Sequence, residues 1–133
     1  MILIDLSVND TYGHSVGDEV LKFLAVEMQE VSRRQDICCR YGGEEFILLL
    51  PETTMIEAFD VAERLRKKLE ATVSPSGEAI TISSGIASLP ECAHHITELI
   101  EIADKRLYEA KNTGRNKSIM ANYSKASKLP SLS

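Results

Sequence analysis

The sequence predicts an α+β fold in which helices flank a mixed central β-sheet. Short apolar runs alternate with longer stretches of helical periodicity, in the order strand, helix, two strands, helix, strand, helix. The two consecutive strands read as a hairpin and are therefore antiparallel, whereas strands separated by helices tend to be joined by crossovers. The chain has 133 residues, of which 44% are hydrophobic, so it can enclose a core within one domain. A sheet of mixed strand direction, covered by helices, follows from this order.

The first elements are a strand and a helix separated by a polar loop. Residues 1–6 (MILIDL) form an apolar run typical of a buried strand, and residues 7–14 (SVNDTYGH) are rich in turn formers. Helical periodicity begins at Gly17, and Ser15 and Asp18 have the spacing of a capping box at that start. The apolar residues on one face of this predicted helix are Val20, Leu24, Met28 and Val31.

A hairpin and a second helix come next. The strand-like runs ICCRY and EFILLL are separated by Gly42 and Gly43, and paired glycines favour a tight turn because primed turns need positive φ. Thr54 and Glu57 repeat the capping-box spacing and predict the start of the second helix. Its apolar face consists of Ala58, Val61, Leu65 and Leu69.

The last part of the chain predicts a strand, a third helix and an edge strand. AITISSGIAS is strand-like, and helical periodicity begins near Thr97, with Leu99, Ala103, Leu107 and Ala110 facing inward. Gly114 is placed to end this helix, and KSIMANY can add a final edge strand. We therefore expect a domain over residues 1–120 and a flexible polar tail over residues 121–133.

Composition excludes several classes of function. A formal net charge of −5 argues against a surface that coats nucleic acid, although a small phosphorylated ligand needs only a few local cations. No apolar run approaches the roughly 18 residues that span a membrane, and no signal peptide or P-loop motif is present. The three cysteines, Cys38, Cys39 and Cys92, do not form a disulfide framework or a zinc motif, which indicates a reduced, cytoplasmic setting.

The stretch RYGGEEF places two carboxylates at the start of an apolar strand. If the first strand lies beside this hairpin, Asp5 converges with Glu44 and Glu45. Such hard oxygen ligands suit Mg²⁺, which usually shares its coordination shell with substrate phosphates. Gly42 and Gly43 would let a phosphate approach the backbone. Taken alone, the hairpin favours an ordinary solvated turn over a functional site.

RYGGEEF resembles the signature of GGDEF-domain diguanylate cyclases, in the GGEEF spelling. Four further segments resemble that family in order and spacing: NDTYGHSVGDEVL, RRQD, TISSGIA and ADKRLYEAKNTGRN. The resemblance covers about residues 3–119. It implies a domain of the nucleotide-cyclase or polymerase-palm type.

The resemblance also implies an activity and its partners. Family members condense two GTP molecules into cyclic di-GMP and release two pyrophosphates, with Mg²⁺ or Mn²⁺ as cofactor. Each domain holds one GTP, so a homodimer is needed. The family domain is cytoplasmic and usually follows a sensory or dimerising module, which in a full-length protein can be tethered to a membrane. Neither nucleic acid binding nor membrane insertion is expected of this chain.

Individual residues match the family's functional positions. The metal site would consist of the carboxylates of Asp5, Glu44 and Glu45 with the Leu6 carbonyl, and Glu44 would also handle the proton of the attacking 3′-hydroxyl. The substrate-binding residues implied by the resemblance are Asn9, His14, Asp18, Gly42, Gly43, Lys111 and Arg115. Among these, Asn9 and Asp18 would read guanine. A helix cap for Asp18 and a helix-dipole contact for Lys111 remain alternative interpretations.

A second site would bind the product. Arg33 and Asp36 match the family's inhibitory Arg-x-x-Asp site, and Arg64 resembles a secondary arginine of that site. An arginine can stack on guanine and can donate in a fork to guanine or phosphate. The alternative interpretation is a solvated charge pair at a helix end, which would contribute little.

The sequence departs from the family in its first metal-binding segment. Asp5 and Asn9 lie four positions apart where the family has eight, and a Phe-Lys pair is missing. The helical lead-in before the first strand is also absent. Two functions therefore stay open: an active diguanylate cyclase with product inhibition, or an impaired GGDEF domain that binds GTP or cyclic di-GMP as a regulatory module. A related cyclase acting on another base is a third, which the Asn9 and Asp18 pair disfavours.

Overall fold

The structure is a computed structural model that describes residues 1–7 and 13–121, with side chains described for 1–7 and 16–121. Its elements in chain order are β1 (Ile2–Ser7), α1 (Gly13–Val31), β2 (Ile37–Gly42), β3 (Glu45–Leu49), α2 (Met55–Glu70), β4 (Thr81–Ile86), α3 (Ile96–Asn112) and β5 (Ser118–Ile119). Across this described part, no helix combines the length and apolar character that crossing a membrane requires. Apart from Ala121, the predicted tail lies outside the described residues.

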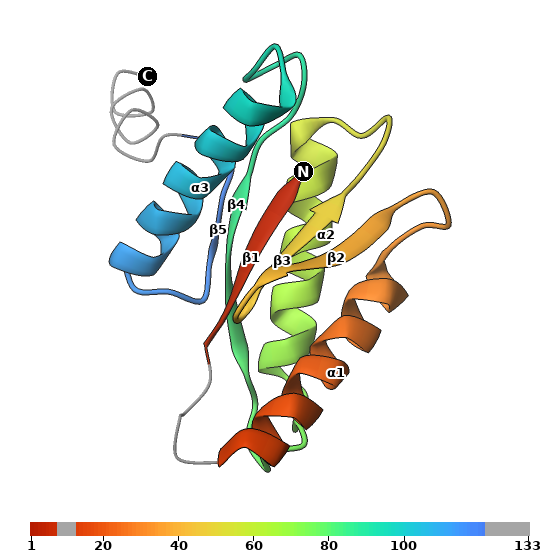
Figure 1. Ribbon diagram of the computed structural model, residues 1–133, viewed down its shortest axis with the longest axis vertical. Helices are drawn as coiled ribbons and strands as arrows, with labels where there is room; N and C mark the ends of the chain where they lie inside the picture. Colours follow the sequence, from red (N-terminus) through yellow and green to blue (C-terminus); the bar gives the residue numbers. More distant parts are fainter. Residues whose placement is uncertain (8–12, 122–133) are drawn as a thin grey trace.

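The five strands form one mixed sheet in the order β2-β3-β1-β4-β5 (Figure 1). The pairs β2–β3, β3–β1 and β1–β4 are antiparallel, and β4–β5 is parallel. The predicted α+β fold with a mixed central sheet is therefore confirmed. The first strand lies directly beside the hairpin strand β3, which is the arrangement that the carboxylate argument requires.

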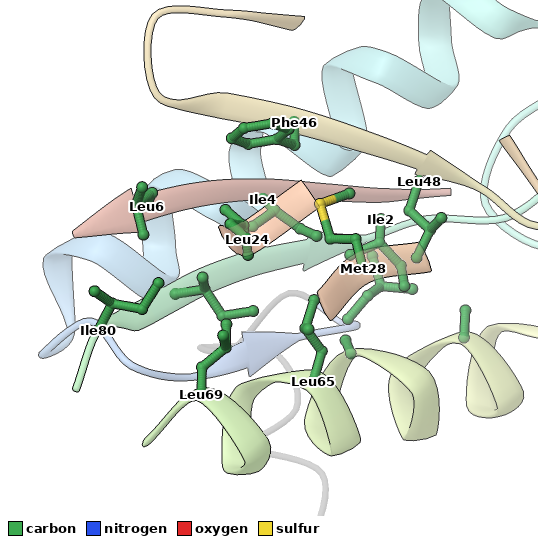
Figure 2. Close-up of a cluster of buried hydrophobic side chains, with 14 of the residues drawn as sticks. Ile2, Ile4, Leu6, Leu24, Met28, Phe46, Leu48, Leu65, Leu69 and Ile80 are labelled. Atoms are coloured by element: carbon green, nitrogen blue, oxygen red, sulfur yellow. The ribbon is translucent and has the colours of Figure 1, made fainter. Parts of the chain in front are cut away.

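The sheet has a helical layer on each face, because successive strand residues point to opposite sides. Ile2, Ile4 and Leu6 point toward α1 and α2, where they meet leucines of both helices in the larger core (Figure 2). Leu3 points the other way and joins Met1 and residues of α3 in a second, smaller core. Because successive residues of β1 point to opposite faces of the sheet, this one strand contributes side chains to both cores.

Two of the three predicted helix starts are confirmed. In α2 the Glu57 N–H donates to Thr54 Oγ1 at 3.1 Å, and the Thr54 N–H donates to Glu57 Oε1 at 2.9 Å, which completes the capping box. Helix α3 begins at Ile96, one residue before the predicted start, and buries all four expected residues.

The predicted start of α1 is wrong. The helix begins at Gly13 rather than at Gly17, so the supposed capping box of Ser15 and Asp18 lies inside the helix and does not start it. A glycine within a helix costs only about 0.5–1 kcal/mol. The burial of Val20 and the following apolar face is enough to offset that cost.

The hairpin forms as predicted, but its turn is shifted by one residue. Gly42 pairs with Glu45, so the two turn residues are Gly43 and Glu44, and Gly43 has a φ of +48°. A β-bulge interrupts the register between Arg40 and Gly42. The shift places Glu44 at the tip of the turn and makes Glu45 the first residue of β3.

Candidate active site

The centre of the site is a pair of carboxylates on neighbouring strands. Asp5 of β1 is directly opposite Glu45 of β3 and Ser83 of β4. Directly opposed residues of antiparallel strands project from the same face of the sheet. That face is the one covered by α3, because Asp5 and Leu3 have the same alternation. Asp5 is only 9% exposed, and Glu45 is partly buried.

Two cations from the end of α3 reach this carboxylate pair. Lys111 Nζ and Arg115 Nη1 each lie 3.6 Å from Asp5 Oδ2. Arg115 Nη1 also donates to Ser7 Oγ at 3.3 Å. A carboxylate that is largely removed from water needs such partners, because desolvation penalises an isolated charge. Four of the residues predicted from the sequence, Asp5, Glu45, Lys111 and Arg115, therefore come together.

The electrostatics of the pair favour a bound cation. Partial burial raises the pKa of Glu45 above its ordinary value, and the negative charge of Asp5 raises it further, while Lys111 acts in the opposite direction. Adjacent carboxylates repel each other, and a divalent ion between them would relieve that repulsion. Within residues 1–7 and 16–121, no three His, Cys, Asp or Glu side chains are grouped to hold a metal. Mg²⁺ needs only one or two carboxylates when phosphates and waters complete its shell, so the residues present fit this ion.

Glu44 contributes its backbone, and its side chain is exposed. The Leu6 N–H donates to the Glu44 carbonyl at 3.0 Å, which fixes the turn one residue away from Asp5. The Glu44 side chain lies at the solvent-exposed tip of the hairpin. A Cβ added at Gly42 or Gly43 would meet nothing within 4 Å, so the backbone there is open to a ligand.

The predicted guanine-reading residues are only partly placed. Asn9 and the side chain of His14 lie outside the described residues. Asp18 is exposed in α1. Their predicted convergence on a guanine base thus stays a prediction.

The three residues of the predicted product site line one cavity. Arg33, Asp36 and Arg64 all face a cavity of about 560 Å³ between the end of α1, the turn after β3, and α2. Arg33 is held in place by the Pro51 carbonyl, to which its Nη2 donates at 3.1 Å, and by Thr53 Oγ1. Its guanidinium is therefore oriented before any ligand binds.

Asp36 has one carboxylate oxygen without a hydrogen-bond partner. Asp36 Oδ2 accepts from the Arg33 N–H at 2.7 Å, and the side chain is only 2% exposed. Asp36 Oδ1 lies 3.6 Å from Arg33 Nη2, too far for a hydrogen bond, and has no other partner in the part of the chain that the structure describes. A buried carboxylate oxygen in this condition lacks the hydrogen-bond partner that such groups ordinarily have.

Sequence reasoning missed two residues of the candidate site. Arg40 donates from Nε and Nη2 to the Gly43 carbonyl, at 2.9 and 2.7 Å, and so holds the turn that carries Glu44. Its position in RYGGEEF was a signal for it. Ser83 is fully buried opposite Asp5, and its Oγ has no hydrogen-bond partner among the described residues. Ser83 could be placed opposite Asp5 only after the register between β1 and β4 was known.

Comparison with known proteins identifies the family. Residues 2–117 match the family described as diguanylate cyclase, GGDEF domain, and the chain belongs to that family. It is 43% identical to diguanylate cyclase A of Treponema denticola over 122 residues, which cover 88% of this chain and 33% of that protein. It is 44% identical to diguanylate cyclase DgcM of Escherichia coli over 126 residues, covering 91% and 30% of the two chains. The chain thus spans about a third of these curated relatives.

Solved structures agree with the fold. The active GGEEF domain of a diguanylate cyclase from Vibrio cholerae superposes with a TM-score of 0.84 at 37% identity, covering 91% of this chain and 81% of that chain. The coiled coil and GGDEF domain of DgcB from Caulobacter crescentus, solved with cyclic di-GMP, gives a TM-score of 0.81 at 28% identity. That match covers 90% of this chain and 68% of that chain. The predicted cyclase or palm-like architecture is confirmed.

Proposed function

We propose that this domain is a diguanylate cyclase that condenses two GTP molecules into cyclic di-GMP and two pyrophosphates. The observation that carries the proposal is the convergence of Lys111 and Arg115 on Asp5 beside Glu45. Carboxylates that suit a divalent ion and cations that suit phosphates lie at one end of one sheet. The match to named diguanylate cyclases supports the same reaction.

The reaction consists of two phosphoryl transfers. In each, the 3′-hydroxyl oxygen of one GTP bonds to the α-phosphorus of the other, the bond from that phosphorus to the β-phosphate oxygen breaks, and pyrophosphate leaves. The hydroxyl proton passes to a base, for which we propose the Glu44 carboxylate, because it is exposed at the hairpin tip where a partner domain can approach. One domain holds one GTP, so two copies must face each other.

The residues divide into those that hold metal and those that hold nucleotide. Asp5, Glu44, Glu45 and the Leu6 carbonyl would hold Mg²⁺ or Mn²⁺, which when bound neutralises phosphate charge. Asn9, His14 and Asp18 would bind guanine. Lys111, Arg115 and the open backbone at Gly42 and Gly43 would bind the phosphates.

Because Lys111 and Arg115 pair with Asp5, the charge partners in the site should differ between the empty and the nucleotide-bound domain. Without nucleotide, these cations offset the buried carboxylate at 3.6 Å. When nucleotide binds, its phosphates would compete for Lys111 and Arg115, and Asp5 and Glu45 would then hold a divalent ion whose charge offsets theirs. Nucleotide and metal should therefore bind cooperatively, because neither alone leaves every charge paired.

Incubation of the purified chain with GTP and Mg²⁺, followed by mass spectrometry of the products, tests the proposal. We expect cyclic di-GMP from the unmodified chain and a loss of about 10²–10⁴-fold in Glu44→Gln, the range for removing a general base. Glu101→Gln is the matched control, because Glu101 is an exposed carboxylate of α3 away from the site. Normal turnover in Glu44→Gln would contradict the role of Glu44.

A binding module is the second candidate function. The shortening between Asp5 and Asn9, with the missing Phe-Lys pair, favours it. It predicts that calorimetry detects binding of GTP or cyclic di-GMP while no product forms. Product formation would eliminate this candidate, and the absence of both turnover and binding would eliminate both candidates.

We further propose that cyclic di-GMP inhibits through the cavity of Arg33, Asp36 and Arg64. An arginine fork suits the O6 and N7 of guanine, and the Asp36 carboxylate, which lines the cavity, can accept from the guanine N1–H or amino group. Calorimetry should show at least about tenfold weaker binding of cyclic di-GMP to Arg33→Ala, because a charge-assisted contact is lost. Arg34→Ala is the control of equal charge, since Arg34 is exposed and does not line the cavity. Equal binding to both variants would exclude this cavity.

We also propose a cytoplasmic location for the domain. GTP is a cytoplasmic metabolite, and all three cysteines are free. Free thiols persist where the compartment keeps them reduced.

A further inference from the structure

Asn116, just after the end of α3, bridges to the last two turns of α2. Arg66 Nη1 donates to Asn116 Oδ1 at 3.2 Å, and Asn116 Nδ2 donates to Glu70 Oε2 at 2.5 Å. The amide therefore uses its acceptor and a donor at once on the same helix. The proposed chemistry assigns no role to this contact, because the side-chain partners of Asn116 are Arg66 and Glu70 rather than the carboxylates of the candidate site.

The α2 side of the bridge is itself well fixed. Arg66 donates from Nε and Nη2 to the two carboxylate oxygens of Glu63, at 2.7 and 2.8 Å. Its side chain is only 15% exposed, and the same guanidinium lies 3.9 Å from Glu70. A planar guanidinium held by a fork has little freedom, so it presents Nη1 to Asn116 in one direction.

The backbone at this point needs support. Arg115 and Asn116 have φ values of +61° and +47°, so two consecutive non-glycine residues lie in the left-handed region. Such residues are uncommon and persist only where surrounding contacts hold them. The Arg115 N–H is bonded to the Ala110 carbonyl at 2.9 Å, which fixes the helix end, and the Asn116 amide supplies the contact across to α2.

The position of Arg115 depends on this backbone. Its side chain is half-exposed and meets Asp5 Oδ2 at 3.6 Å and Ser7 Oγ at 3.3 Å, both from β1. Both contacts lie at the tip of a long side chain, so the direction in which that side chain leaves the main chain matters for them. Asn116, the next residue, shares the left-handed backbone of Arg115 and ties it to α2.

We propose that Asn116 is a positioning residue for nucleotide phosphates: clamped between Arg66 and Glu70, it holds Arg115 over Asp5. The inference rests on the proposed function, because it takes Arg115 as a phosphate ligand. Asn116 touches no substrate in this scheme and acts only through Arg115.

The local fold should survive loss of the amide. The Ser84 N–H donates to the Lys117 carbonyl at 2.9 Å, and Lys117 Nζ donates to the Thr113 carbonyl. These contacts hold β5 and the helix end independently of Asn116. A substitution at Asn116 is therefore expected to move Arg115 without detaching β5.

Three substitutions separate the contributions. Asn116→Ala removes the amide and disfavours the left-handed backbone, and Asn116→Gly removes the amide but permits that backbone. Asn116→Asp keeps the acceptor for Arg66 and places a negative charge against Glu70. Asn112→Ala is the matched control, because Asn112 is an exposed asparagine in the last turn of α3.

The readouts are calorimetric binding of a non-hydrolysable GTP analogue with Mg²⁺ and, separately, turnover of GTP. We expect all three Asn116 variants to bind the analogue more weakly, Asn116→Ala by about tenfold as for one charge-assisted contact, with KM raised more than kcat is lowered. Asn112→Ala should bind as the unmodified chain does. Thermal denaturation confirms that each variant is folded.

A double-mutant cycle with Arg115→Ala decides how Asn116 acts. If Asn116 works through Arg115, then Asn116→Ala should cost little further binding once Arg115 is removed. An equal loss in both backgrounds would show a merely structural role and overturn the inference. Unchanged binding in Asn116→Ala would overturn it too. Failure of the unmodified chain to bind the analogue would instead refute the proposed function and the inference with it.

Discussion

Gly85 of β4 sits where α3 presses on the sheet, and Gly85→Ala should damage that contact. A Cβ at this position would lie 2.1 Å from the Ala103 carbonyl oxygen and 2.4 Å from the Leu107 nitrogen. Both are backbone atoms of α3, so no side chain can rotate to make room. The backbone of Gly85 is not in the left-handed region, so close approach is the reason for glycine here.

The expected cost follows from how far α3 must move. Relieving the clash needs a shift of about 0.9 Å, and a gap of that size forfeits about a quarter to a half of the contact energy. The buried residues of α3 are Leu99, Ala103, Leu107 and Ala110. Their burial contributes about 5–8 kcal/mol at roughly 1.5–3 per leucine and 0.8 per methyl group. We therefore expect the free energy of unfolding to fall by about 1–4 kcal/mol, a range that includes the cost of about 1–3 kcal/mol for overpacked cores.

Urea denaturation followed by circular dichroism measures this change. Gly17→Ala is the matched control, because an added Cβ there would meet nothing within 4 Å and the residue lies in α1. We expect that control to be neutral or stabilised by up to about 1 kcal/mol. Because α3 carries Lys111, Gly85→Ala should also weaken GTP binding where the domain stays folded. An unchanged free energy of unfolding in Gly85→Ala would refute the close packing of α3 on β4.

Three further predictions concern the helix cap and the hairpin. Thr54→Ala should lower the free energy of unfolding by about 1 kcal/mol in urea denaturation, because α2 loses its N-cap; an unchanged value would contradict the cap. Hydrogen bonds to Thr54 lower the pKa of Glu57, so its contribution to stability is present above the ordinary glutamate pKa and disappears as the pH falls through the lowered value. Calorimetric melting should show that component in the unmodified chain and lack it in Glu57→Gln, and identical pH profiles would count against it. Arg40→Ala should reduce turnover about tenfold or more by releasing Gly43, with stability within about 0.5 kcal/mol of Arg34→Ala; full turnover would exclude that role.

Local patterns in the sequence predict most of the secondary-structure elements. The Thr54 and Glu57 spacing marks the start of α2, because a capping box satisfies orphan donors with nearby residues alone. The inner face of α3 follows from helical periodicity in the same way, and all four expected residues are buried. The hairpin follows from glycines between two strand-like runs. Each of these features depends on neighbours within a few positions.

Three features of the structure were not marked by the local sequence pattern. The true start of α1 at Gly13 precedes the apolar face that signals the helix. The placement of the turn at Gly43 and Glu44 depends on a bulge, and that bulge accompanies the Arg40 contact. The bridge from Asn116 to Arg66 joins residues 50 positions apart. Only the family resemblance brought Lys111 and Arg115 into the site before the structure showed their contact with Asp5.

The alternation that builds the two cores also builds the site. In β1, Ile4 and Leu6 face α1 and α2, while Leu3 and Asp5 face α3. A register slip of one residue would point Asp5 into the leucine core and Leu6 toward Lys111. Such a slip would lose the apolar contacts of β1, so those contacts stabilise the observed register. The cores thus fix the register, and the register places Asp5 opposite Glu45. For this reason a core substitution such as Leu3→Ala is expected to disturb nucleotide binding as well as stability, since the geometry of the carboxylate pair is set by the packing beneath it.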